Sequence, residues 1–217
     1  MLRQPGCPIC ALALRAVGRF IQTLAYEQVN DLAVRDQLRS AGGFCHPHAY
    51  GWLREAHNVL GTALIYRDLL GALLAQLEQP PAEQAGVLGT LLRSRAGPRP
   101  RRRGACPACR AQHEAEDRYL GALLEGLAEP GLADEFGRSS GLCYLHALAA
   151  ARRGGPTAAL VVERTRDAAE DLIADLSEVV RKEDYRFRGE ARTQAEATAP
   201  HRAIAWAVGA EGLTASS

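Results

Sequence analysis

The sequence predicts an all-α protein made of two related helical halves. No stretch alternates apolar and polar residues with a period of two, as a half-buried strand would. Apolar residues instead recur at helical spacing in several long segments. The chain also repeats itself, because residues 43–49 (GFCHPHA) return as residues 141–147 (GLCYLHA). At 217 residues the chain is long enough to bury a core of its own without help from a metal.

Each half is expected to open with a cysteine pair at the start of a helix. Cys7-Pro8-Ile9-Cys10 precedes the first copy of the repeated segment, and Cys106-Pro107-Ala108-Cys109 precedes the second at nearly the same distance. Proline suits the first turn of a helix, where its missing N–H costs nothing. A helical stripe then predicts a helix from Cys10 to about Gln28, with apolar residues at Leu14, Val17, Ile21, Leu24 and Ala25.

Three more helices are expected in the first half. Asp31 suits the N-cap of a helix that runs to Ser40, where Gly42-Gly43 ends it. An amphipathic stripe predicts a single long helix over residues 46–78. A further helix is expected over residues 82–95.

The second half is expected to replay this order and to end in a tail. A helix begins at Cys109, and after a break a long helix runs over about residues 157–184. Residues 184–188 (DYRFR) are expected to dock on the helical body, because two exposed aromatics are costly. A short helix is expected at residues 200–208, with fraying at residues 215–217.

These patterns predict four segments. Residues 1–95 form the first repeat, and residues 96–104, rich in arginine and proline, form a linker. Residues 105–188 form the second repeat. Residues 189–217 form the C-terminal tail.

The cysteine and histidine spacing predicts two zinc sites per chain. Each C-x2-C pair is followed by a C-x2-H pair, and three thiolates with one imidazole are a ligand set that tetrahedral zinc prefers. The repeat selects the histidines, because His48 and His146 occupy the same position in the two copies, whereas His46, His57, His113 and His201 have no such match and are expected to be ordinary polar residues. The predicted ligands are Cys7, Cys10, Cys45, His48, Cys106, Cys109, Cys143 and His146.

Two pairings of these ligands are open, and the local one is favoured. In the local pairing each half closes its own site, because a helix that leaves Cys10 and a chain that returns would bring Cys45 back beside Cys7. In the crossed pairing Cys7 and Cys10 meet Cys143 and His146. Either way the ligands lie at helix N-termini, which favour thiolates.

Other readings of the cysteines are less well supported. An iron–sulfur cluster remains an alternative, as do reduced cysteines without a metal. The C-x-x-C-H motif of haem attachment is absent, and no βαβ pattern supports thioredoxin-like chemistry. Four protein ligands per site would leave no position for a substrate, and no catalytic motif occurs, so an enzyme is not favoured.

The charge pattern and the absence of targeting motifs limit the kinds of partner and the cellular location that the sequence predicts. The net charge of +1 gives no global attraction to nucleic acid or membrane. A local exception is the linker, whose arginines make nucleic-acid binding the alternative function, through Arg99, Arg101, Arg102 and Arg103. No signal peptide or membrane span is expected, and the protein is predicted to be cytoplasmic.

Several motifs together resemble a functionally uncharacterised family of bacterial proteins. They are the two Cys-Pro-x-Cys pairs, Tyr26-Glu27, Gly43-Phe44-Cys45 with His48-Ala49, Tyr66 to Leu69 (YRDL) and Lys182 to Arg188 (KEDYRFR). The resemblance covers nearly the whole chain. It implies metal ligands at the eight positions, with Trp206 matching a tryptophan of the tail, and it implies no activity.

The function predicted from the sequence is that of a non-enzymatic zinc protein, a binding or scaffold module for a protein partner. A third alternative is a thiol-based redox or metal sensor.

Overall fold

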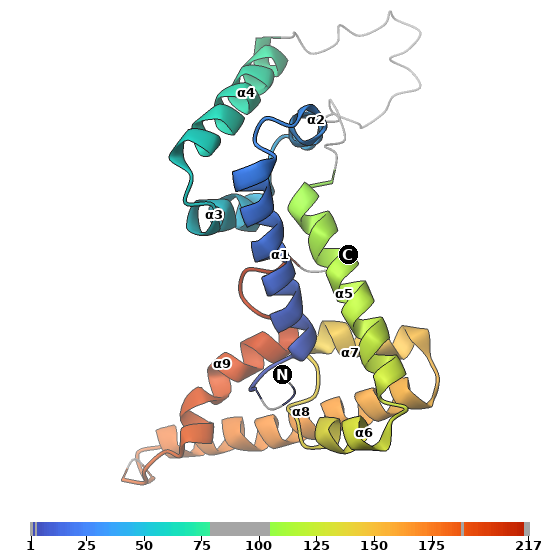
Figure 1. Cartoon of the computed structure of the whole chain (residues 1–217). Helices are drawn as coiled ribbons and strands as arrows, with labels where there is room; N and C mark the ends of the chain where they lie inside the picture. The colour runs from blue at the N-terminus through green and yellow to red at the C-terminus, as the bar shows by residue number, and fades with distance from the viewer. Residues whose placement is uncertain (1, 3, 79–104, 188, 215–217) are drawn as a thin grey trace, which may run out of the picture. The chain divides into compact units, whose positions relative to one another are not determined.

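The described part of the chain is entirely helical. The structure is a computed structural model that describes residues 2, 4–78, 105–187 and 189–214. Within these residues it has nine helices and no strand (Figure 1), which confirms the all-α prediction. The helix expected at residues 82–95, the linker at 96–104 and the last three residues lie outside the described residues. The helices are α1 (Pro8–Glu27), α2 (Leu32–Ala41), α3 (His46–Glu55), α4 (Val59–Glu78), α5 (Pro107–Gly126), α6 (Pro130–Gly137), α7 (Tyr144–Arg153), α8 (Pro156–Glu183) and α9 (Gln194–Val208).

Local sequence signals account for most helix ends. α1 and α5 begin at the proline of each cysteine pair. The Asp31 side chain accepts a hydrogen bond from the Val34 N–H at 3.0 Å and so caps α2, while Gly42 ends α2 in the left-handed conformation. α8 follows the expected range closely. α9 is longer than expected, because Thr193 caps it and the helix begins at Gln194, six residues before the proline at which it was predicted to begin.

The single helix predicted over residues 46–78 is broken after Ala56. His57 has φ 43°, and Asn58 caps the start of α4 by accepting from the Gly61 N–H at 2.8 Å. The Asn58 amide also donates to the Ala25 carbonyl at 2.8 Å and so fixes the break against α1. The apolar stripe continues through this point, and for that reason periodicity alone did not reveal it.

The chain divides into two compact units that do not follow the predicted segments. The terminal unit contains Met1–Ala16 and Gln112–Ser217, and the middle unit contains Val17–Ala111. α1 therefore begins in the terminal unit and ends in the middle unit, whereas α5 does the reverse. Each unit combines the first turns of one repeat's cysteine helix with the remainder of the other repeat.

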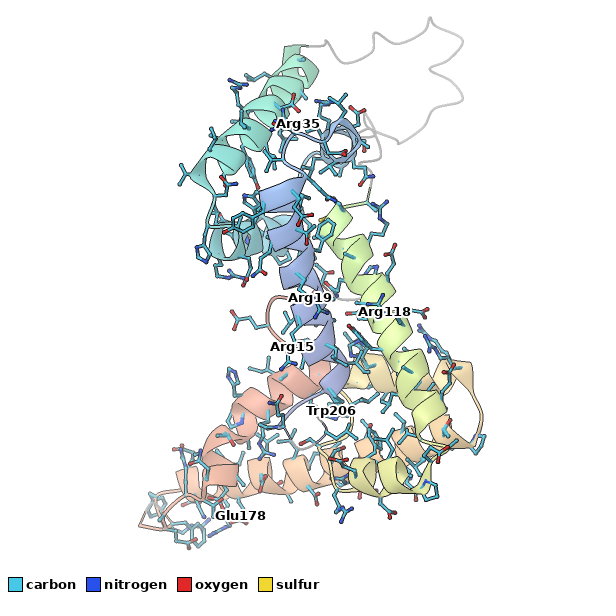
Figure 2. All side chains as sticks on the ribbon, in the orientation of Figure 1. Arg15, Arg19, Arg35, Arg118, Glu178 and Trp206 are labelled. Carbon is cyan, nitrogen blue, oxygen red and sulfur yellow. The ribbon has the colours of Figure 1, made fainter. Side chains whose placement is uncertain are left out.

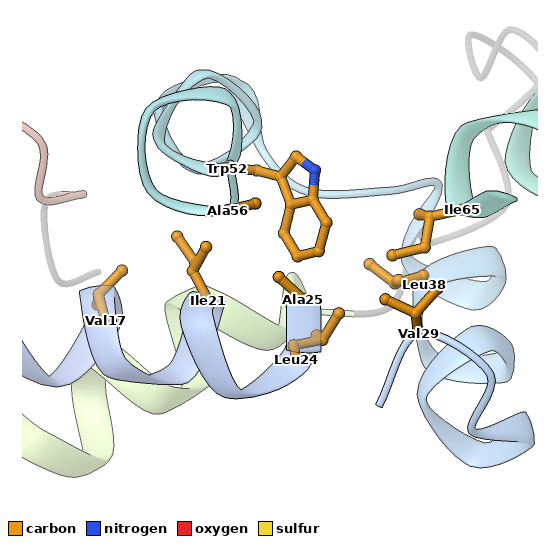
Figure 3. Packing of buried hydrophobic residues seen from close by; sticks show 9 residues of the cluster. All are labelled: Val17, Ile21, Leu24, Ala25, Val29, Leu38, Trp52, Ala56 and Ile65. Carbon is orange, nitrogen blue, oxygen red and sulfur yellow. The ribbon is translucent and has the colours of Figure 1, made fainter. Parts of the chain in front are cut away.

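The core of the middle unit surrounds Trp52. This side chain is fully buried, its Nε1 donates to the Thr62 hydroxyl at 2.9 Å, and Phe44 stacks on it with ring centroids 5.6 Å apart. The indole packs with residues from α1, α2 and α4 (Figure 3). Each large apolar side chain buried in this way contributes about 1.5–3 kcal/mol. The cluster is Val17, Ile21, Leu24, Ala25, Val29, Leu38, Trp52, Ala56 and Ile65.

The core of the terminal unit includes the residue between the first two cysteines. Ile9 is buried with Leu120, Phe136, Leu142 and Val161, so the cysteine pair is anchored by the hydrophobic core. In the same unit α8 and α9 pack together, and Lys182 of α8 pairs with Glu196 of α9 at 2.8 Å, both nearly buried.

α1 also has the length and apolar composition of a membrane span, and it is the one such helix found in the described residues. Its apolar face is the one that packs in the two cores, with Ile9 in the terminal unit and Ile21 and Leu24 in the middle unit. A buried core helix meets the same criteria.

The expectation that residues 184–188 dock is corrected for the first aromatic. Tyr185 is 81% exposed. Phe187 is half-buried, with the Arg181 guanidinium 4.7 Å from its ring centroid. The two aromatics do not pack together, because α8 ends at Glu183 and Asp184 bonds Arg186 in the following turn.

The glycine of each repeated segment is required by its backbone and its neighbours. Gly43 has φ 97° and Gly141 has φ 68°, a region that residues with a side chain rarely adopt. A Cβ atom on Gly141 would also lie 2.9 Å from the Thr165 Cα, and one on Gly43 would lie 2.7 Å from a Leu69 methyl. Each turn therefore lies directly against a long helix, α8 or α4.

Gly141→Ala is expected to lower the free energy of unfolding by about 1–3 kcal/mol, from backbone strain and the contact with Thr165. Urea unfolding of the metal-loaded protein measures this. Gly131→Ala is the control, since a Cβ there meets nothing within 4 Å. Equal decreases in the free energy of unfolding of the Gly141→Ala and Gly131→Ala variants would contradict a specific requirement for glycine at position 141.

Candidate metal centres

The structure brings the eight predicted ligand residues together in two groups of four. The terminal centre contains Cys7, Cys10, Cys143 and His146, and the middle centre contains Cys45, His48, Cys106 and Cys109. Within each group the sulfur and imidazole nitrogen atoms lie within 4.8 Å of one another. Each centre lies inside one compact unit.

The pairing is the crossed one, which corrects the expectation of local sites. Each centre joins the C-x2-C pair of one repeat to the C-x2-H pair of the other. α1 carries the chain about 30 Å from Cys10, since its 20 residues rise about 1.5 Å each, whereas the ten residues of α2 cover only about 15 Å. The chain therefore does not return to Cys7 before Cys45.

All four ligand pairs lie at helix N-termini, as predicted. Cys45 and Cys143 are the N-cap residues of α3 and α7, and their histidine partners lie in the first turn. Cys7 and Cys106 directly precede α1 and α5, and Cys10 and Cys109 follow in the first turn. The free N–H groups and positive dipole ends of two helices thus face each centre, which offsets the excess negative charge of three thiolates.

The terminal centre has the dimensions of a single-ion site. His146 Nδ1 lies 3.5, 3.4 and 3.1 Å from the sulfurs of Cys7, Cys10 and Cys143, and the Cys10 and Cys143 sulfurs are 3.7 Å apart. A tetrahedral ion with metal–sulfur bonds of ~2.3 Å and metal–nitrogen bonds of ~2.0 Å places its ligand atoms roughly 3.5–3.8 Å apart. The four side chains therefore fit one tetrahedral metal ion.

The middle centre has the same dimensions. His48 Nδ1 lies 3.2, 3.8 and 3.4 Å from the sulfurs of Cys45, Cys106 and Cys109, and the Cys45 and Cys109 sulfurs are 3.5 Å apart. Cys45 and Cys109 are half-buried, whereas Cys106 and His48 are buried. Two of the three cysteines of this centre are thus partly exposed to solvent.

Proton-binding in the terminal centre shows why a cation suits it. Hydrogen bonds with Cys143 and Cys7, reinforced by burial, raise the pKa of Cys10 far above its usual range. Burial lowers the pKa of His146, but hydrogen bonds to Cys143, Cys7 and Glu116 outweigh that effect and raise the pKa to about 12. Burial raises the pKa of Cys7, but hydrogen bonds from Cys10, Cys143 and His146 outweigh that effect and lower the pKa well below its usual range. Without a metal the Cys10 sulfur and the His146 ring thus retain protons, and a metal ion would take the place of those protons.

The middle centre shows the same competition at Cys106. Burial raises the pKa of this thiol, but hydrogen bonds from His48 and from backbone groups of Cys45 and Cys109 outweigh it and lower the pKa to about 6. A thiol with a pKa near 6 is a thiolate at neutral pH, the form that binds metals.

The terminal centre has an outer set of polar residues that sequence reasoning did not identify. His146 presents Nδ1 to the sulfurs, and its Nε2 lies 3.7 Å from a Glu116 carboxylate oxygen. Gln112 donates to that same oxygen at 2.8 Å and to the Thr214 carbonyl at 2.8 Å, and it accepts from the Thr214 N–H at 3.0 Å. A carboxylate on the outer nitrogen of a ligating histidine fixes the ring and strengthens the ligand.

The middle centre has no equivalent carboxylate. His48 Nε2 is buried and has no hydrogen-bond partner within the described residues. The repeat aligns Cys109 with Cys10 and therefore Glu116 with Val17, so an apolar residue occupies the position of the carboxylate. The two centres have the same types of ligand, three cysteines and one histidine, but differ in the residue that lies beside the outer nitrogen of the histidine.

The remaining candidate residues lie outside both centres. His46, His57, His113 and His201 are exposed, and His46 contacts the Tyr50 ring at 5.0 Å. Arg99, Arg101, Arg102 and Arg103 lie outside the described residues, so nucleic-acid binding through them stays a prediction.

The crossed pairing predicts which cysteines become reactive when one ligand is removed. Cys45→Ser is expected to expose Cys106 and Cys109 to iodoacetamide while Cys7 and Cys10 stay protected in the metal-loaded protein. Mass-spectrometric mapping of the alkylated cysteines measures this. The reciprocal variant, Cys143→Ser, should expose Cys7 and Cys10. Alkylation of Cys7 and Cys10 in the Cys45→Ser variant would contradict the crossed pairing and support the local one.

Glu116→Gln is expected to weaken metal binding at the terminal centre by about 10- to 100-fold, because the outer partner of His146 is lost. Cys45→Ser provides a background in which the terminal centre alone remains, and competition with a chromophoric chelator gives the affinity. Glu125→Gln, an exposed residue on the same helix, is the control. An unchanged metal affinity in the Glu116→Gln variant would show that this carboxylate does not contribute to metal binding at the terminal centre.

Comparison with known proteins yields relatives without a known activity. A protein of Caldicellulosiruptor sp. (strain Rt8B.4), described as an uncharacterized 23.9 kDa protein in the xynA 3′ region, is 41% identical over 68 residues. That alignment covers 31% of this chain and 32% of the relative, so the chain spans about a third of the relative's length. No solved structure matches. The profile of a family of unknown function, DUF6062, matches residues 1–211, and the chain belongs to this family.

Proposed function

We propose that this chain is a non-enzymatic zinc protein of the cytoplasm that holds two structural zinc ions and acts as a binding or scaffold module. The observation that carries the proposal is the closed ligand set of each centre, with three sulfurs and one imidazole nitrogen at single-ion distances. Catalytic zinc keeps a position for water or substrate, whereas structural zinc has four protein ligands.

The ligand spacing favours zinc over an iron–sulfur cluster. In an iron–sulfur cluster the four protein ligands are divided among two or four irons, so ligand atoms on different irons lie farther apart than around one ion. Here the Cys10–Cys143 and Cys45–Cys109 sulfur pairs are 3.7 and 3.5 Å apart. One tetrahedral ion per centre accounts for these distances.

Exposed apolar side chains support a protein partner. On α3 and α4 of the middle unit several large apolar residues are more than half exposed, and exposed apolar surface of this kind is a feature of protein interaction sites. They are Tyr50, Leu53, Val59, Leu60, Leu70 and Leu74.

Purified protein is expected to contain two zinc ions per chain by elemental analysis. X-ray absorption should give three sulfur and one nitrogen neighbours per ion, at ~2.3 and ~2.0 Å. Iron with visible absorbance, or fewer than one metal ion per chain after metal-replete expression, would contradict the proposal.

The exposure of the middle centre favours a redox sensor as the second candidate function. Cys45 and Cys109 are half-buried with sulfurs 3.5 Å apart, and His48 lacks the outer partner that His146 has. Hydrogen peroxide can accept two electrons from these two thiolates and, with two protons, become two waters while a disulfide forms. The loss of two ligands would then release the ion.

Peroxide is therefore expected to release one zinc ion well before the other, with a Cys45–Cys109 disulfide found by peptide mapping. A thiol reductant with added zinc should restore both ions. The terminal centre is the internal control, because two of its three cysteines are buried. Simultaneous release of both ions, or earlier release from the terminal centre, would contradict the sensor.

A further inference from the structure

A cavity of about 710 Å³ lies in the terminal unit beside its metal centre. α8 and α9 form its walls, together with the turn that precedes α7 and the residues before α1. This volume is that of a small-molecule site, for which about 300–1,000 Å³ is typical. The roles described so far for the fold and for the two metal centres do not explain this cavity.

The charged residues that line the cavity are mostly cationic. Arg138, Arg164 and Arg202 all line it, whereas Asp171 is the one carboxylate among its lining residues. Arg202 pairs with Asp175 at 2.6 Å, which leaves the charges of Arg138 and Arg164 against that of Asp171. The Nε atoms of Arg164 and Arg138 donate to backbone carbonyls, so their terminal nitrogens remain for a ligand.

Two buried donors in the lining lack an acceptor. Arg202 Nε and Trp206 Nε1 are both buried, and within the described residues neither has a hydrogen-bond partner. Buried N–H groups are nearly always paired, so two unpaired ones in a single cavity indicate a missing acceptor. Ser140 and Thr198 add hydroxyl groups to the same lining.

The lining also has apolar side chains and a flat aromatic element. Leu142, Ala168 and Leu172 contribute aliphatic surface. The Trp206 indole, on α9 (Figure 2), contacts the Tyr144 ring at 5.9 Å, which limits its rotation. A ligand with a planar apolar body could therefore stack beside the indole while its charged end meets the arginines.

We propose that this cavity binds a small organic anion, a carboxylate or phosphate ester with a planar apolar body. The inference rests on the proposed binding role and gives it a ligand class. Cys7 and Cys143 also line the cavity, so an occupant would lie against two cysteines of the terminal centre. Ligand binding should thus slow metal loss from that centre.

Calorimetric titration of the metal-loaded protein tests the proposal, with phenyl phosphate and phenylacetate as the two anionic probes. Benzyl alcohol tests the need for charge, and inorganic phosphate tests the need for the apolar body. At least one aromatic anion is expected to bind more tightly than both, with an affinity that falls as salt rises. The stronger of the two identifies the preferred charged group.

Arg164→Gln is expected to weaken the stronger probe by about tenfold or more. Arg166→Gln is the matched control, two residues along α8 and outside the cavity lining. Arg138→Gln carries the same expectation and serves if Arg164→Gln disturbs the turn whose Ser139 carbonyl it bonds. Metal content and thermal unfolding of each variant confirm that it is folded.

The proposal is overturned if neither aromatic anion binds, if benzyl alcohol binds equally well, or if Arg166→Gln weakens binding as much as the cavity variants. These results would leave zinc content untouched and so would not count against the zinc protein. Conversely, a chain that binds the anion but holds no zinc would overturn the proposed function alone.

Discussion

The exchange of cysteine pairs between the two repeats is the constraint on which the rest of the structure depends. Cys10 and Cys143 are separated by 133 positions, and Cys45 and Cys109 by 64, yet each pair of sulfurs lies within 4 Å. Closing such long loops costs conformational entropy, and metal binding supplies free energy only once both ligand pairs have met. A metal ion in each centre would therefore stabilise long-range order, and α1 and α5 each contribute to both compact units.

The same local arrangement, a ligand pair at the N-terminus of a helix, occurs four times. Each pair lies in or beside the first turn of a helix, so its two side chains face the same way and free N–H groups point at the metal. For Cys45 and Cys143 the arrangement depends on the preceding glycine turn, which α4 or α8 holds in place through Leu69 or Thr165. The long helices are thereby coupled to the metal centres without contributing a ligand.

Local sequence signals predicted the local structure, and tertiary contacts decided the remainder. Asp31, Gly42 and the prolines of the cysteine pairs mark helix ends by backbone chemistry that does not depend on the fold. The nearly identical ligand spacing of the repeats is compatible with either pairing, so only the path of the chain through α1 and α2 could exclude the local one. The break at His57 depends on Asn58 reaching the Ala25 carbonyl, a contact between distant segments. The role of Glu116 could not be predicted from the sequence for the same reason, since His146, which it contacts, lies 30 positions away on α7.

The two centres have the same types of ligand but different surroundings. At the terminal centre Glu116, Gln112 and Thr214 support His146, and the tail reaches the centre, where a Cβ at Gly209 would lie 3.7 Å from the Cys10 sulfur. At the middle centre Val17 takes the position of Glu116, and His48 keeps an unpaired buried nitrogen. A supported histidine and mostly buried cysteines favour retention of an ion, whereas an unsupported histidine and two partly exposed cysteines favour exchange. The same ligand set would therefore form a stable wall of the proposed anion cavity in the terminal unit and the proposed redox-responsive centre in the middle unit.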